Sequence, residues 1–163
     1  MFHLPVSARA VKLALALALA LAASACAKTG DELGQGGAGA PGSPQEFVAT
    51  VGDRVFFETD SSELTGAAQA TLTKQATWLT RYGNYAFTIE GNADERGTRE
   101  YNFALGARRA QATRDYLASK GIAGSRMRTV SYGKERPVAT CDDISCWSQN
   151  RRAVTVLSGA PGS

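Results

Sequence analysis

The chain has 163 residues, a length that suggests one domain, and 20% of its residues are charged, with a formal net charge of +3. Its only histidine is His3, so everything after the N-terminus lacks the residue that Ser-His-Asp and Cys-His catalysis and histidine-containing metal sites require. Without the N-terminal Arg9 and Lys12, sixteen basic side chains face fifteen acidic ones, and this balance gives no reason to expect nucleic-acid binding.

The N-terminus has the pattern of a signal peptide, which we predict over residues 1–25. A basic stretch precedes an unbroken apolar run of eleven residues, from Leu13 to Ala23. A membrane-spanning helix needs about 20 apolar residues. We therefore expect an exported chain rather than one that is anchored by this helix.

The cleavage site has two interpretations. Ala23-Ser24-Ala25 fits ordinary secretory cleavage, which would release a soluble periplasmic protein with a free Cys26. Small residues followed directly by cysteine also resemble a bacterial lipobox, although Ala23 stands where leucine is usual. An odd cysteine in an exported protein calls for an explanation, and lipidation of Cys26 with acyl chains such as palmitate would supply one.

The segment from Ala27 to Glu46 is rich in Gly, Ala and Pro. It has almost no apolar residues to bury, so we predict that residues 26–46 are a lipidated N-terminus and a flexible linker. The folded domain is predicted over residues 47–163.

Within this domain, the apolar patterns predict the order β-α-β-α-β-β. This order indicates an α+β fold, with helices packed on a mixed sheet. Thr65 is a plausible cap for the first helix, and Leu105, Ala110, Thr113 and Leu117 would line the inner face of the second. The strands are predicted at residues 54–58, 85–91, 126–133 and 151–157, and the helices at residues 66–81 and 107–121.

Two cysteines, Cys141 and Cys146, lie close together in ATCDDISCWSQ. An exported chain is in an oxidising compartment, and no second pair of metal ligands lies nearby in the sequence. A disulfide is therefore favoured over a zinc site.

Twenty residues from Gly91 to Ala110, GNADERGTREYNFALGARRA, contain three acidic residues and four arginines. They begin where the second predicted strand ends and continue through a loop into the second predicted helix. Loops carried by a rigid scaffold are where binding residues collect. Asp94 and Arg109 are too far apart for a local helical pair, so only the fold could bring them together.

This stretch resembles the signature of the OmpA-like peptidoglycan-binding domain family, and FFETDSSEL, SYGKERPV and NRRAVTVL extend the similarity. With the upstream Cys26, the chain resembles the family's lipid-anchored, peptidoglycan-associated members over residues 54–157. The resemblance implies a non-catalytic protein of the outer membrane, facing the periplasm, with no metal or cofactor. It implies binding to diaminopimelate in the peptidoglycan stem peptide, partnership with TolB and the other Tol proteins, and a role in constriction at cell division.

The resemblance also assigns site residues. The family's aspartate falls on Asp94, which would pair with the ammonium of diaminopimelate, and its arginine falls on Arg109, which would form a bidentate pair with the carboxylate. Residues predicted to line or brace the pocket are Asp60, Asn102, Leu105 and Arg151. The neighbouring charges, Arg96 among them, are interpreted as surface residues, and the Cys141–Cys146 segment is expected to lie outside the site.

One position departs from the family pattern. Asn92 stands where the family commonly has histidine or another aromatic, which leaves the packing at the strand end open.

Two other functions are considered. A peptidoglycan hydrolase could use Asp94 with Glu95 or Glu100 as a carboxylate pair. A flagellar-stator subunit can carry the same domain, but it would need a spanning helix of about 20 residues.

Overall fold

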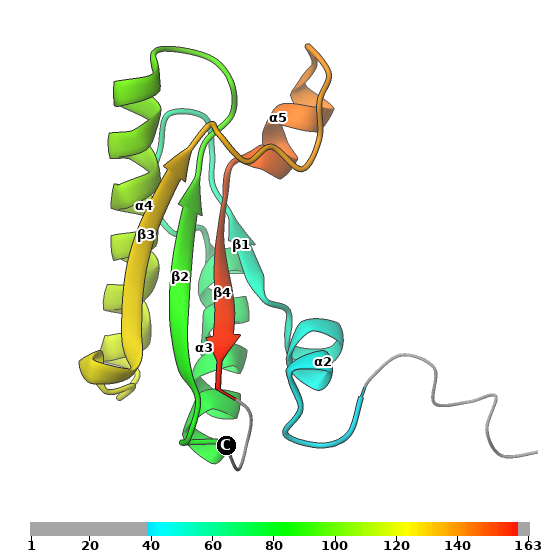
Figure 1. Cartoon of the computed structure of the whole chain (residues 1–163), viewed down its shortest axis with the longest axis vertical. Helices are drawn as coiled ribbons and strands as arrows, with labels where there is room; N and C mark the ends of the chain where they lie inside the picture. The colour runs from blue at the N-terminus through cyan, green and yellow to red at the C-terminus, as the bar shows by residue number, and fades with distance from the viewer. Residues whose placement is uncertain (1–38, 160–163) are drawn as a thin grey trace, which may run out of the picture. The chain divides into compact units, whose positions relative to one another are not determined.

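A four-stranded mixed sheet with the order β1-β4-β2-β3 forms the centre of the fold (Figure 1). The structure is a computed structural model that describes residues 39–159. Strand β2 pairs in parallel with β3 and antiparallel with β4, and β4 pairs antiparallel with β1. The predicted mixed sheet is confirmed. The strands are β1 (Arg54–Phe56), β2 (Ala86–Asn92), β3 (Met127–Gly133) and β4 (Arg152–Ser158).

Two long helices, α3 (Gly66–Arg81) and α4 (Arg99–Ser119), lie against one face of the sheet, behind it in Figure 1. Helix α3 begins after the predicted cap Thr65, whose hydroxyl accepts a hydrogen bond from the backbone N–H of Ala68 at 3.2 Å. Leu72 and Leu79 on its apolar stripe are fully buried. The helix therefore forms where its apolar spacing predicts.

Helix α4 begins at Arg99, well before the predicted start at Ala107. The reason is a second N-cap, because the hydroxyl of Thr98 accepts a hydrogen bond from the backbone N–H of Tyr101 at 3.2 Å. Much of the charged stretch is therefore helical, and only residues 93–98 form the loop.

Ordered contacts begin before Phe47, inside the segment that was assigned to the linker. The Glu46 carboxylate accepts hydrogen bonds from Trp78 Nε1 at 3.0 Å and from the Gly42 backbone N–H at 2.6 Å. The Tyr85 hydroxyl donates to the Gly42 carbonyl at 2.7 Å. These polar contacts correct the predicted boundary toward the N-terminus, while the signal peptide, Cys26 and most of the linker lie outside the described residues. Short elements that were not predicted are α2 (Pro44–Glu46), the π-helical turn η1 (Phe47–Val51), the 3₁₀ turn η2 (Gly124–Arg126) and α5 (Ile144–Asn150).

The core lies between the sheet and the helices, and it includes Phe47, Phe87, Ile89 and Leu117, each no more than 1% exposed. Helix α4 and strand β2 approach so closely that a side chain on Gly91 would overlap the backbone oxygen of Gly106. This approach holds the middle of α4 against the C-terminal end of β2. No helix between residues 39 and 159 is long and apolar enough to cross a membrane.

Candidate functional site

A pocket of about 260 Å³ lies where β2 ends, between α4 and the segment that follows β1. Five of the six residues predicted for ligand binding line it, and the sixth, Arg151, contacts Asp94 from behind. The fold thus brings together residues that are far apart in the sequence; their contact with a ligand stays a prediction. The lining residues are Thr59, Asp60, Asp94, Arg96, Gly97, Tyr101, Asn102, Leu105 and Arg109.

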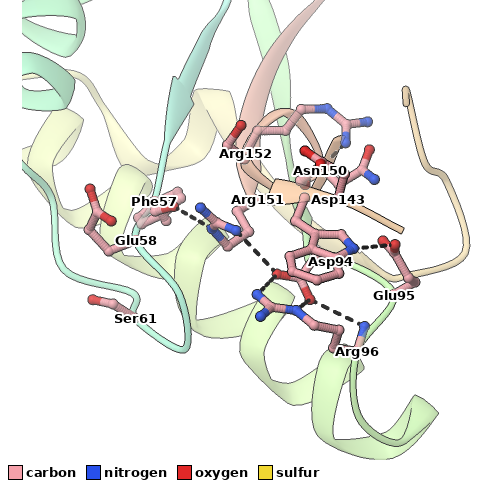
Figure 2. A network of polar contacts seen from close by, with 12 residues as sticks. Phe57, Glu58, Ser61, Asp94, Glu95, Arg96, Asp143, Asn150, Arg151 and Arg152 are labelled. Atoms are coloured by element: carbon pink, nitrogen blue, oxygen red, sulfur yellow. Dashed lines mark hydrogen bonds and ion pairs between the residues drawn. The ribbon is translucent and has the colours of Figure 1, made fainter. Parts of the chain in front are cut away.

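Asp94 is held between two arginines, as Figure 2 shows. Its carboxylate is 2.7 Å from Nη2 of Arg96 and 3.4 Å from Nη1 of Arg151, and its side chain is only 9% exposed. Burial raises the pKa of Asp94, but the hydrogen bonds from Arg96 and Arg151 outweigh it, so the pKa of this carboxyl lies below its usual value. Asp94 is therefore a stable anion at neutral pH.

Arg109 is fully buried, and its guanidinium bonds to the protein's own backbone. It donates to the carbonyl oxygens of Ser61 at 2.8 Å, Asn92 at 2.8 Å and Glu58 at 3.1 Å. Burial, and secondarily the charge of Arg151, lowers the pKa of Arg109 to about 10, so it stays protonated at neutral pH. Arg109 thus also fixes the segment after β1 to the end of β2, a structural role that the sequence analysis did not predict.

Arg109 forms no ion pair with Asp94, because among the described residues Asp94 forms its ion pairs with Arg96 and Arg151. A guanidinium has five N–H donors, and the three carbonyls use three of them. The two that remain are the number that a bidentate pair with a carboxylate requires. The pocket therefore presents an anion and a cation that do not neutralise each other.

The other predicted residues have separate structural tasks. The side-chain N–H of Asn102 donates to the Arg96 carbonyl at 2.7 Å and so fixes the loop. Leu105, 4% exposed, forms an apolar wall. Arg151 donates from Nε to the Phe57 carbonyl at 2.9 Å and braces Asp94.

Asp60 lies at the rim of the pocket, in the segment after β1. It has a left-handed backbone with φ of 54°, and its carboxylate accepts a hydrogen bond from the hydroxyl of Tyr101. Aspartate tolerates this backbone better than most residues. Tyr101 itself lies in the lining of the pocket, 43% exposed.

Arg96 is the charged residue of the pocket lining whose role sequence reasoning missed. Its Nε and backbone N–H both donate to Oδ1 of Asp94 at 3.2 Å, so it grips the carboxylate from two sides. Its guanidinium carbon also lies 4.1 Å from the ring centroid of Trp147 in α5. A spacing of two residues gave no reason to pair Arg96 with Asp94, and nothing local points to Trp147.

The predicted disulfide is present, and Cys141 and Cys146 have Cα atoms 5.7 Å apart. No residue of the segment that it closes lines the pocket, but the residue that follows Cys146 contacts two residues of the Asp94 loop. The segment leads into α5, where Trp147 Nε1 donates to the Glu95 carboxylate at 2.5 Å.

Asn92, the departure from the family pattern, is 1% exposed at the end of β2. Its backbone carbonyl accepts the hydrogen bond from Arg109, while its side-chain Oδ1 has no hydrogen-bond partner within the described part of the chain. The backbone of this position, not its side chain, supports the site.

A second hollow, of about 480 Å³, lies between α4 and the edge strand β3. Its charged lining includes the Arg99–Glu135 pair, which is largely exposed, and the ring of Phe103 is 56% exposed. It lacks the buried, oppositely charged side chains of the smaller pocket, so the smaller pocket is the better candidate. No cluster of metal-ligating side chains occurs in residues 39–159.

Comparisons with known proteins agree with this description. Residues 56–151 match the model of the OmpA family. A peptidoglycan-associated lipoprotein of Agrobacterium fabrum is 71% identical over 131 residues, which cover 79% of this chain and 74% of that protein. The crystal structure of the peptidoglycan-associated lipoprotein from Burkholderia pseudomallei superposes with a TM-score of 0.63 at 43% identity, over 65% of this chain and 90% of that one. The C-terminal domain of Helicobacter pylori MotB shares the fold, with a TM-score of 0.62 at 20% identity over 66% of this chain and 85% of that one.

Proposed function

The chain belongs to the OmpA family, and from this premise we propose that it is an outer-membrane lipoprotein that binds peptidoglycan non-covalently through diaminopimelate. The similarity to proteins named peptidoglycan-associated lipoproteins supports this proposal. The observation that carries it is the pocket that holds Asp94 and Arg109 without pairing them with each other.

The chemistry of diaminopimelate fits these two charges. The free end of this residue in the stem peptide carries an ammonium and a carboxylate. The ammonium joins Asp94, whose carboxylate stays ionised, and the carboxylate takes the two remaining donors of Arg109. Asn102 and Arg151 hold the loop and the anion in place, Leu105 packs against the methylene chain of the ligand, and Asp60 with Tyr101 forms the rim.

Arg109 has no accessible surface in the free protein. We infer that the rim opens when the carboxylate enters, by movement of the side chains of Asp60 and Tyr101. The contact that must give way is the hydrogen bond between Asp60 and Tyr101, which lies at an exposed position. An exposed hydrogen bond contributes little free energy, so opening the rim has a small free-energy cost.

Lipidation of Cys26 would anchor the chain in the outer membrane, and residues 26 to about 40 would link the anchor to the wall-binding domain. In this arrangement the protein tethers the membrane to the wall. It would act with TolB and the other Tol proteins to keep the envelope intact and to support constriction at division.

A hydrolase is disfavoured by the state of Asp94. A general acid in a glycosidase needs a raised pKa, whereas the pKa of Asp94 is lowered by its arginine partners. Its neighbour Glu95 accepts a hydrogen bond from Trp147, and Glu100 is exposed on the first turn of α4.

The test is a titration of the purified protein with two soluble stem peptides that differ only in ending with diaminopimelate or lysine. Lysine lacks the terminal carboxylate, so its peptide should bind roughly tenfold to a hundredfold more weakly, the loss of a charge-assisted interaction. Arg108→Lys is the matched control, because Arg108 is exposed and adjacent to Arg109, and it should bind both peptides as the parent does. Equal affinity of the parent for the two peptides would refute recognition of diaminopimelate.

A further inference from the structure

The loop that carries Asp94 is held by contacts from several elements. Among these elements, α5 has no role in the proposed function. Asn102 of α4 holds the Arg96 carbonyl, and Nζ of Lys134, just after β3, donates to the carbonyls of Glu95 and Gly97 at 3.1 and 2.7 Å. These contacts restrain the backbone of the loop, and they leave the side chains of Glu95 and Arg96 to be placed by something else.

Trp147 of α5 restrains both of these side chains. Its Nε1 donates to Glu95, and its ring lies under the guanidinium of Arg96, which in turn grips Asp94. We infer that Trp147 is a positioning residue for the ligand pocket, acting through Arg96 on the carboxylate that receives the ligand's ammonium. The inference rests on the proposed function of that pocket.

The physical reason is pre-organisation. The side chain of Arg96 is 40% exposed, so without the ring it would sample other rotamers, and Asp94 would lose one of its two arginine partners for part of the time. If the carboxylate must be ordered again when the ligand binds, the entropy of that ordering lowers the affinity. Loss of Trp147 should therefore weaken binding without removing any atom that touches the ligand.

The disulfide extends this effect. Cys146 immediately precedes Trp147, and its bond to Cys141 ties the first turn of α5 to the preceding loop. Asn150 holds the other end of the helix, because its amide bonds to Val138 and Ala139. Breaking the disulfide would loosen the end that presents Trp147, so its removal should weaken binding by the same route and to a smaller extent.

The experiment measures the dissociation constant of the full chain, purified in detergent, for the stem peptide that ends in diaminopimelate. Trp147→Leu, which removes the ring and the N–H, should weaken binding about three- to tenfold. Trp147→Phe keeps a ring for Arg96 and should lie between Leu and the parent. Ile144→Ala is the matched control, since Ile144 lies on the same helix, 57% exposed, and it should bind as the parent does.

A double-mutant cycle separates positioning from general destabilisation. Adding Trp147→Leu to a Cys141→Ser/Cys146→Ser protein should cause less than its full loss, because both changes act through one contact. Additive losses, a Leu variant that binds like the parent, or an equal loss in Ile144→Ala would each overturn the inference while the proposed function stands. A parent that fails to bind the peptide would overturn both.

Discussion

Arg109→Lys is expected to lower both the stability of the fold and the affinity for the ligand. The guanidinium spans three backbone carbonyls, at 2.8, 2.8 and 3.1 Å, which belong to two segments of the chain, the one after β1 and the end of β2. A lysine ammonium at the same depth is a single point and can reach only one of them. Two of the three carbonyls then lose a charged donor.

The magnitude follows from these two losses. A hydrogen bond to a charged group contributes about 1.5–3 kcal/mol net, and water that enters from the pocket side would recover part of it. We therefore expect the free energy of unfolding to fall by about 3 kcal/mol, measured by urea denaturation of the parent and the variant. A fall of less than about 1 kcal/mol would refute the assignment of Arg109 as a structural tie.

The chain offers a matched control in Arg126, which also donates to three backbone carbonyls, those of Tyr85, Leu79 and Tyr82, at 2.8, 3.0 and 3.3 Å. Arg126 is remote from the pocket lining. Arg126→Lys should therefore destabilise the fold to a similar extent and leave the affinity for the diaminopimelate peptide unchanged. If both variants bind the peptide equally well, the ligand role of Arg109 is excluded, and only its structural role remains.

Three further predictions concern Asp94 and the three cysteines. Asp94→Asn should weaken peptide binding roughly tenfold to a hundredfold. Because the hydrogen bonds of the folded protein lower the pKa of Asp94, the stability that this charge contributes is complete above about pH 3.9 and is lost as the pH falls through the lower folded pKa. Urea unfolding of the parent and the variant across a pH series checks this, and a stability difference that does not shrink as the pH falls below about 3.9 would contradict it. The Cys141→Ser/Cys146→Ser protein should unfold with about 2 kcal/mol less free energy, and unchanged denaturation midpoints would speak against a stabilising disulfide. Mass measurement should find Cys26 at the mature N-terminus with acyl chains, and a Cys26→Ser chain that is processed normally and stays equally membrane-bound would exclude lipidation.

The order of strands and long helices was predictable because each shows one strong local pattern. Leu72 and Leu79 recur at helical spacing in α3, and Phe87 and Ile89 alternate in β2, so burial of one face determines both elements. The start of α4 was missed because charged residues conceal the helical periodicity of its first turns. Thr98 was the available signal, as an N-cap one residue before the helix.

Short elements were missed for a different reason. Helix α5 has no apolar stripe, and it is fixed by Asp143 at its cap, by the disulfide and by Asn150, which bonds to a loop outside the helix. The turn before Phe47 is held by the hydrogen bond from Trp78 to Glu46, two residues that are far apart in the sequence. Such contacts arise from the tertiary fold, and no local window of sequence contains both partners.

The site residues were predictable from the motif, but their partners were not. Asp94 and Arg109, with Asp60 and Arg151 beside them, suggested two anions and two cations, which would make a neutral pocket. The structure adds Arg96, which pairs with Asp94. Three cations then face two anions, so the pocket attracts a carboxylate more strongly than an ammonium. Under the proposed function, Asp94 would make the approach of an ammonium tolerable beside this excess of positive charge. Recognition would therefore depend on the terminal carboxylate at least as much as on the ammonium, and the carboxylate is the group by which diaminopimelate differs from lysine.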